Sequence, residues 1–188
     1  MNRCFVGNNS QRGTFVVEFA TISFALVLLM AFCGDLVIRL ATKGKLDRMA
    51  YSAVTIIKER SALFAAEDFQ LLDGGVRQTQ FDELHKIVEA SLIRTMGSFN
   101  AQQFGMTLDV IGSGENDELV RVSNTLPDDK GIQCESSQSM QTLATALKLD
   151  TSPTLYRVTL CYETINWFGG LLGEDYGMVS SHAISIGR

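Results

Sequence analysis

The sequence contains little of what most catalytic and metal-binding sites need. Its 188 residues include two histidines and four cysteines, and none of these stands in a CxxC or HxxxH spacing. The phosphate-binding pattern GxxxxGK[ST] and the nucleophile pattern GxSxG are both absent. We therefore expect no catalytic residue, no metal ion and no cofactor.

Proline and positive charge are also scarce. Two prolines exclude Pro-rich repeats, and 16 Lys and Arg against 21 Asp and Glu give a net charge of −5. Because no basic field surrounds the chain, nucleic acid is not an expected partner. The length allows one ordinary domain, and a hydrophobic content of 46% excludes a disordered tail.

The apolar residues gather near the N-terminus. Residues 1–13 contain Arg3 and Arg12 but no acid, and they end in Gly13. Sixteen residues without charge then run from Phe19 to Gly34, fewer than the roughly 20 that a membrane-spanning helix needs. The span from Thr14 to Gly34 is long enough but includes Glu18. A carboxylate there costs up to a few kcal/mol, so it calls for a partner or a purpose.

Two interpretations of this segment leave Glu18 without a role. One is a secretory signal peptide cut after Ala31-Phe32-Cys33, a poor match to the small-x-small rule. The other is an uncleaved membrane anchor, with Glu18 solvated at headgroup level. The rival function that goes with them is an anchored periplasmic enzyme or sensor domain that uses residues 1–36 only for export.

A third interpretation explains Gly13 and Glu18 together. The junction Gly13-Thr14-Phe15-Val16-Val17-Glu18-Phe19 resembles the class III leader of type IV prepilins, with a basic leader, a glycine at the cleavage point and Glu at the fifth mature position. The pair Glu18-Phe19 is similar to that of the tight-adherence (Tad, Flp) branch. The resemblance implies that a prepilin peptidase cleaves between Gly13 and Thr14 on the cytoplasmic side.

The resemblance also implies a role for the carboxylate. Cleavage exposes the α-amino group of Thr14, a cation that is costly within a membrane, and Glu18 of the same or a neighbouring subunit neutralises it. Pairing between subunits sets their axial register during assembly.

The charges that flank the apolar run conflict with this orientation. Arg3 and Arg12 precede the run, whereas four basic residues follow it: Arg39, Lys43, Lys45 and Arg48. A count of Lys and Arg places the C-terminal side in the cytoplasm, and the prepilin interpretation requires the opposite. We favour the prepilin interpretation because the count is statistical and because the cysteines favour export.

The rest of the chain predicts a helix-and-sheet domain. Apolar residues recur at steps of four, three and four at Leu46, Ala50, Ala53 and Ile57, so one helix is expected from Val16 to Leu72, ending at Asp73-Gly74-Gly75. A second helix is expected at 81–96, with Leu84, Ile87, Val88, Leu92 and Ile93 on one side. Alternation predicts four strands, at 106–111, 118–123, 155–163 and 177–186, with a turn at 112–117 and a short helix at 139–149. The expected fold is α+β, a long N-terminal helix packed on a small, mainly antiparallel sheet, as in type IV pilins.

Cys134 and Cys161 are the two cysteines of the predicted soluble part, because Cys4 lies in the leader and Cys33 in the apolar run. A pair in an exported domain indicates a disulfide. Its loop closure stabilises the domain by roughly 3–4 kcal/mol. Two unrelated buried thiols are the alternative.

The remaining candidate sites have plain explanations. His85 and His182 lack partners at metal-binding spacing and fit surface or core positions. The acidic cluster Glu115, Asp117 and Glu118 departs from calcium-loop spacing and fits a solvated turn. The stretch from Trp167 to Gly173 is apolar and glycine-rich; packing is the usual explanation, and an exposed docking loop is the alternative.

The resemblance extends, more loosely, over the whole chain. Major tight-adherence pilins are little more than the helix, so a chain with a head resembles the minor pseudopilins, TadE or TadF, and the head with Cys134 and Cys161 is closer to TadF. The implied organisation is a leader (1–13), a transmembrane part of the helix (14–38) and a periplasmic or extracellular head (39–188). The implied partners are the prepilin peptidase, a TadE-like partner, the major Flp pilin, the inner-membrane assembly platform and the lipid bilayer. Whether the subunit stays in the inner membrane or leaves with the fibre remains open.

Overall fold

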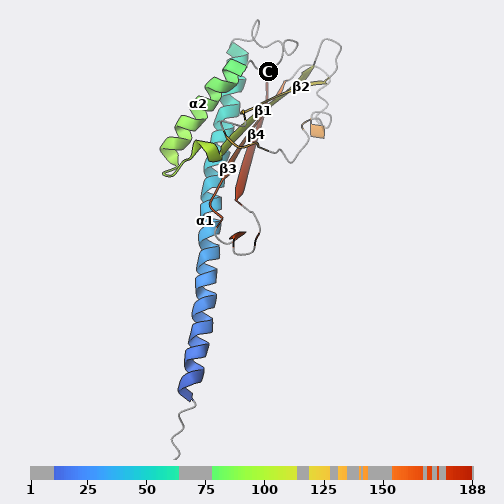
Figure 1. The fold of residues 1–188 in the computed structure, drawn as a ribbon. Helices are drawn as coiled ribbons and strands as arrows, with labels where there is room; N and C mark the ends of the chain where they lie inside the picture. The colour runs from blue at the N-terminus through green and yellow to red at the C-terminus, as the bar shows by residue number, and fades with distance from the viewer. Residues whose placement is uncertain are drawn as a thin grey trace, which may run out of the picture.

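One long helix carries a small head at its C-terminal end (Figure 1). The computed structural model describes residues 11–63, 78–113, 119–127, 131–134, 140, 142–143, 154–166, 169–170, 173 and 177–187. The elements in chain order are α1 (Gln11–Leu63), α2 (Gln78–Thr95), the 3₁₀ turn η2 (Ala101–Gln103), β1 (Phe104–Ser113), β2 (Leu119–Thr125), β3 (Leu155–Glu163) and β4 (Met178–Ile186).

The helix α1 has 53 residues and is therefore about 80 Å long at 1.5 Å per residue. It begins at Gln11, before the predicted start at Val16, and no proline lies between these two positions. The predicted end at Leu72 lies outside the described residues.

The second half of α1 packs on the head through the stripe that its periodicity predicts. Leu46, Ala50 and Ala53 are fully buried, and Ile57 is 1% exposed. Their spacing of three and four residues places them on one face of the helix. The burial of all four residues confirms the predicted stripe. The two alanines let the helix axis approach the sheet closely.

The helix α2 forms where a helix was predicted, but two residues of the predicted stripe were assigned wrongly. The buried side chains are Phe81, Leu84, Val88 and Leu92. Ile87 and Ile93 are 48% and 57% exposed. At 100° per residue Ile87 points about 105° to one side of the centre of the buried face and Ile93 about 135° to the other side. A buried face of normal width therefore cannot include them.

The four strands form one antiparallel sheet in the order β2-β1-β3-β4. Each lies within a few residues of its prediction, which confirms the α+β architecture. The predicted turn at 112–117 begins inside β1, and residues 114–118 lie outside the described part. Of the predicted helix at 139–149, the structure describes Met140, Thr142 and Leu143, all helical.

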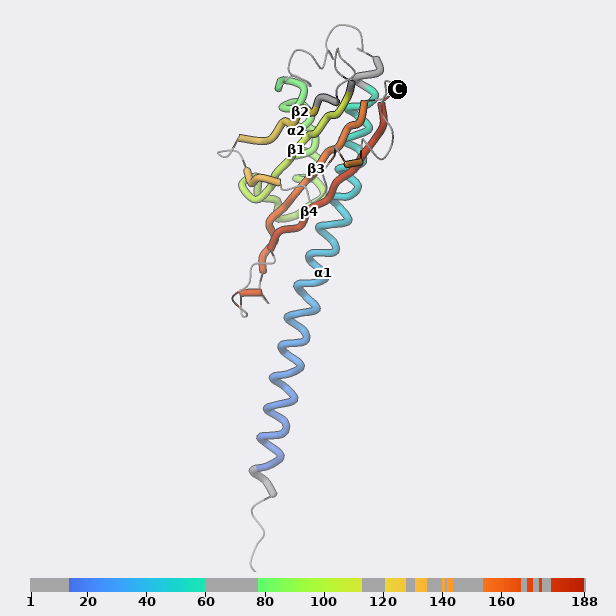
Figure 2. The backbone as a smooth tube through the Cα atoms, turned by 90° about the vertical axis from the view of Figure 1, so that its right-hand side faces the viewer, coloured from blue at the N-terminus to red at the C-terminus, as the bar shows by residue number. Residues whose placement is uncertain are grey.

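The sheet has two different faces. Even-numbered residues of β1 and β3, such as Leu108, Val158 and Leu160, join both helices in the main core. Figure 2 shows α1 running along the β4 side of the sheet, in agreement with its contacts to β3 and β4. The opposite face carries a smaller cluster of Ile111, Leu155 and Met140, so residues from the segment after β2 cover it.

Candidate functional site

The first half of α1 exposes nearly every large apolar side chain that it has. We call these residues the apolar sleeve: Phe15, Val16, Val17, Phe19, Ile22, Phe24, Leu26, Val27, Leu29, Met30, Phe32, Leu36, Val37, Ile38 and Leu40. This is the one helix of the described residues that is long and apolar enough to cross a membrane. So large an apolar surface needs lipid or other helices around it.

The predicted cleavage point and the carboxylate lie at the N-terminal end of the sleeve. The Gly13-Thr14 bond is in the first turn of α1, the part of a helix that opens most readily, and glycine weakens it further. Glu18 is exposed. Because Thr14 and Glu18 are four residues apart, they share a face of the helix.

Two local contacts lie at this end of the helix. The rings of Phe15 and Phe19 stack with centroids 6.5 Å apart, and the hydroxyl of Thr21 donates to the carbonyl oxygen of Glu18 at 2.9 Å. Phe19, the second residue of the predicted pair, thus forms part of the sleeve together with Phe15.

Four charged residues at four-residue spacing lie where α1 meets the head. We call this region the neck and define it by Asp35, Arg39, Lys43 and Asp47. Arg39 Nη2 donates to Asn166 Oδ1 at 2.7 Å, and Lys43 Nζ to the carbonyl of Ser180 at 3.3 Å. The hydroxyl of Ser181 donates to Asp47.

The neck gives a structural reason for two of the four basic residues that follow the apolar run. Arg39 and Lys43 both fix the head on the helix, so their presence has a structural reason independent of membrane orientation. The conflict between the charge count and the prepilin interpretation is weaker for that reason.

A buried ion cluster lies within the sheet. Asp109 of β1 has a fully buried side chain; its Oδ1 accepts from Arg121 Nη2 of β2 at 2.9 Å, and its Oδ2 from Arg157 Nε of β3 at 3.0 Å. Burial raises the pKa of Asp109, but the hydrogen bonds from Arg121, Arg157 and Ser123 outweigh it and hold the pKa below its ordinary value. The carboxylate is therefore ionised and ties three strands together.

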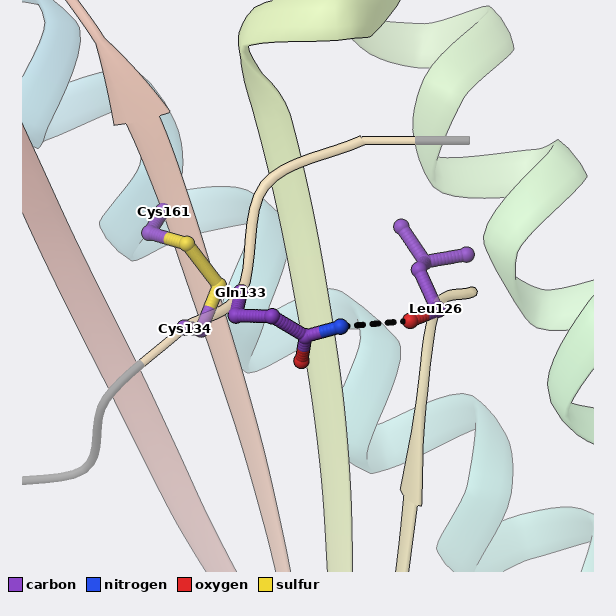
Figure 3. Close-up of a disulfide and its surroundings, with 4 residues drawn as sticks. All are labelled: Leu126, Gln133, Cys134 and Cys161. Atoms are coloured by element: carbon purple, nitrogen blue, oxygen red, sulfur yellow. Dashed lines mark hydrogen bonds between the residues drawn. A yellow bond between two sulfur atoms is a disulfide. The ribbon is translucent and has the colours of Figure 1, made fainter. Parts of the chain in front are cut away.

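The predicted disulfide between Cys134 and Cys161 is present, with Cα atoms 5.6 Å apart. It fixes the segment that follows β2 against β3, as Figure 3 shows. The same segment is held by the Ile132 N–H, which donates to the Phe104 carbonyl at 3.1 Å, and by Gln133 Nε2, which donates to the Leu126 carbonyl at 2.9 Å. Cys33 is an exposed free thiol in the sleeve region.

Gly105 makes this close approach feasible. It pairs with Cys161 across the sheet, and a Cβ there would lie 2.2 Å from the Ile132 carbonyl oxygen and under 3 Å from both sulfur atoms. Only a residue without a side chain fits beneath the disulfide.

The two histidines have ordinary neighbours in the head. His85 stacks on Phe104 and lies 4.0 Å from Glu89, and His182 is exposed on β4. Across the described ranges no three His, Cys, Asp or Glu residues come together as metal ligands. The acidic cluster at 115–118 and the pair Trp167-Phe168 lie outside those ranges.

Sequence reasoning missed the ion cluster and the neck. Asp109 and Arg157 alternate with apolar residues and therefore look like solvent-facing strand positions. One feature of the sequence could have indicated that these positions are buried. About thirty residues connect β2 to β3, and a segment of that length can cover the second face of a sheet.

A long N-terminal helix, apolar and exposed in its first half and packed on an antiparallel sheet in its second, is the arrangement of a pilin-like protein. The family described as "Putative tight adherence pilin protein F" (TadF) matches residues 8–188. The chain therefore belongs to the TadF family. No curated protein and no solved structure matches it.

Membership of this family supports a pilin-like role in a tight-adherence pilus and interaction with other pilus components. It also indicates a structural rather than an enzymatic protein. The long apolar helix is compatible with a single-pass membrane anchor.

Proposed function

We propose that this protein is a minor pseudopilin of a tight-adherence pilus that a prepilin peptidase processes after Gly13. The single observation that carries the proposal is the exposed apolar sleeve with Glu18 at its N-terminal end, five residues after Gly13. Its role in assembly or initiation of the pilus, and in adhesion, is structural and involves no catalysis.

Cleavage after Gly13 creates the assembly-competent end. The new ammonium group of Thr14 lies one helical turn from the Glu18 carboxylate, on the same face of α1. In a medium of low dielectric, each charge lowers the cost of burying the other. When subunits pack side by side, Glu18 of one subunit can meet Thr14 of the next, which fixes their axial offset.

The sleeve determines the location and the partners. Residues 14–38 span the inner membrane, the leader 1–13 is cytoplasmic, and the head from residue 39 is periplasmic, where the disulfide is stable. We expect contacts with a TadE-like partner, the major Flp pilin and the assembly platform, either in the membrane or within the fibre.

Two sets of variants test this function. Gly13→Leu should block processing, because the peptidase requires a small residue at the cleavage point. Glu18→Ala and Glu18→Gln should be processed but should lose co-purification with the other pilus subunits. Glu59→Ala is the matched control, since Glu59 is an exposed acid on the head half of α1.

The rival function makes the opposite prediction. If residues 1–36 serve only to export an enzyme or sensor domain, then Glu18→Ala leaves complex formation and pilus assembly unchanged. That outcome, with Gly13→Leu also silent, would overturn the proposal.

A further inference from the structure

The head and the apolar sleeve overlap along α1. The head covers the helix from Asp35 onwards, since Asp35 is 3% exposed and lies on the same face as Arg39 and Leu46. The sleeve continues on the other faces up to Leu40, which is 69% exposed. Over residues 35–40, about 9 Å of helix, the lowest part of the head therefore stands beside exposed apolar side chains.

The described part of the head at this level is residues 164–166 and 169–170, which follow β3, and Gly177, which precedes β4. Its two ends are joined where the Thr164 N–H donates to the Gly177 carbonyl at 2.8 Å. Asn166 fixes its height, because Asn166 Oδ1 accepts from Arg39 at 2.7 Å and from the Gly169 N–H at 3.0 Å. In Figure 1 the short helical piece at 169–170, coloured red, lies below the sheet at the level of the blue part of α1.

Two large apolar side chains are exposed at this end of the head. Ile165 is 61% exposed, and Met178, at the start of β4, is 52% exposed. Ser180 contacts Lys43, and Met178 lies two strand residues, about 7 Å, further towards the membrane end. That distance corresponds to four or five helix residues, about one helical turn, so Met178 is level with Arg39.

We propose that this end of the head, at Ile165 and Met178, enters the interfacial layer of the bilayer that holds α1. The inference rests on the proposed function, because it requires the sleeve to lie in lipid. Lipid is the occupant that the surface fits, because Ile165 and Met178 are exposed at the level of the last sleeve residues, Leu36 to Leu40, which are exposed as well. Arg39 stands at the same height and Lys43 one helical turn further from the sleeve, where their cations meet lipid phosphates.

The unique tryptophan offers a direct test. Trp167 comes directly after Asn166 and is the only tryptophan of the chain. The full-length protein is reconstituted alone, at low protein-to-lipid ratio, in phosphatidylethanolamine and phosphatidylglycerol vesicles. Lipids brominated near the headgroup or near the acyl-chain end quench tryptophan according to depth. Trp167 should be quenched at least two-fold more by the shallow quencher than by the deep one.

Two reference probes calibrate depth in the Trp167→Phe background. Phe24→Trp lies in the middle of the sleeve and should respond most to the deep quencher. Tyr51→Trp, at a site 70% exposed on α1 and about 18 Å beyond Arg39, should respond to neither.

These probes separate the two possible failures. If Phe24→Trp is quenched deeply but Trp167 behaves like Tyr51→Trp, the inference is wrong and the membrane helix stands. If Phe24→Trp is also unquenched, insertion of α1 fails, and the inference fails with it.

Surface variants test the residues themselves. Ile165→Glu and Met178→Glu should each reduce shallow quenching of Trp167 by at least half. Ile186→Glu, 45% exposed at the opposite end of β4, is the matched control and should not change it. A lipid contact would be contradicted if neither Ile165→Glu nor Met178→Glu changed the quenching of Trp167. It would also be contradicted if quenching were seen only after other pilus subunits are added.

Discussion

The carboxylate of Asp109 lies inside the sheet between two guanidinium groups, one buried and one partly exposed. Arg157 has a side chain 3% exposed and Arg121 one 38% exposed. Removing one member of a buried ion pair is costly because the partner charge remains without compensation. The cluster thus works as a unit that holds β1, β2 and β3 in register.

Asp109→Asn should lower the free energy of unfolding by about 3–5 kcal/mol at neutral pH, because Arg157 loses its buried partner charge. Urea denaturation of the full chain in detergent, followed by circular dichroism, measures this. Glu59→Gln, an exposed acid on α1, should change it by less than about 0.5 kcal/mol. Equal effects of the two variants would refute the structural role of the cluster.

The same residue predicts a pH dependence. The pKa of Asp109 is lower in the folded state than its ordinary value, so its contribution to stability is complete above about pH 4. It is lost as the pH falls through the lower pKa of the folded protein. The unfolding free energy of the wild type should therefore fall more steeply below pH 4 than that of Asp109→Asn. Parallel pH curves for the two proteins would contradict this.

Gly105 is the residue on which the disulfide contact depends most directly. Gly105→Ala places a Cβ within 3 Å of a carbonyl oxygen and two sulfur atoms, and overpacking of this kind costs about 1–3 kcal/mol. Thermal unfolding should show a lower midpoint. Gly97→Ala is the control, because nothing lies within 4 Å of a Cβ at that position. A Gly105→Ala protein as stable as Gly97→Ala would show that the segment can shift at no cost.

At the scale of elements, two adjacent residues of α2 differ in burial, one in the core and one on the surface. Leu92 is fully buried and Ile93 is 57% exposed, although both are aliphatic and of similar size. Leu92→Ala should lower the unfolding free energy by about 2–5 kcal/mol, and Ile93→Ala by less than about 1 kcal/mol. A comparison of their denaturation midpoints checks the packing face. Similar losses for both would mean that Ile93 has a buried partner.

Elements were predictable wherever one physical pattern dominated. The stripe at Leu46, Ala50, Ala53 and Ile57 follows a helical period, and the strands follow a period of two. Ile87 and Ile93 show the limit of this reasoning, because hydrophobicity alone does not define the width of the buried face. The head must be known before those residues can be placed.

The candidate site was predictable only where it is local. The two cysteines of the head form the only pair in the predicted soluble part, and the disulfide joins them. The junction from Gly13 to Phe19 is also contiguous, and its cleavage stays a prediction. The contact of Arg39 with Asn166 joins residues 127 apart, and that of Asp109 with Arg157 joins residues 48 apart. No local pattern predicts such pairings, since they depend on strand order and on how the helix lies on the sheet.

At the scale of the whole molecule, the chain divides into an apolar helix half and a head that folds against the other half. Removal of residues 1–13 takes two arginines and no acid, so 14 basic and 21 acidic residues leave a net charge of −7 on 175 residues. The apolar residues of the sleeve count towards the hydrophobic content but not towards the core of the head. The head therefore has a smaller core than the whole-chain composition suggests, and a covalent link adds to its stability.

The double variant Cys134→Ser, Cys161→Ser should lower the unfolding free energy by about 2–5 kcal/mol. The loss arises because the open segment regains conformational freedom in the unfolded state. Denaturation of the full chain in detergent, with and without reductant, measures the effect on the wild type. A double variant as stable as the wild type would contradict the role given to the link.

Thiol labelling of the processed protein checks the pairing itself. Under denaturing, non-reducing conditions only Cys33 should react, because Cys4 leaves with the leader and the other two cysteines are joined. After reduction three thiols should react. Full labelling of Cys134 and Cys161 without reductant would contradict the disulfide.

The intact mass of the protein purified from membranes of cells that produce a prepilin peptidase tests the central claim most directly. Cleavage after Gly13 predicts a chain that begins at Thr14 and contains 175 residues. The Gly13→Leu protein from the same cells should retain the mass of the precursor. A wild-type chain that begins at Met1, or at Gly34 after signal-peptide removal, would contradict the account.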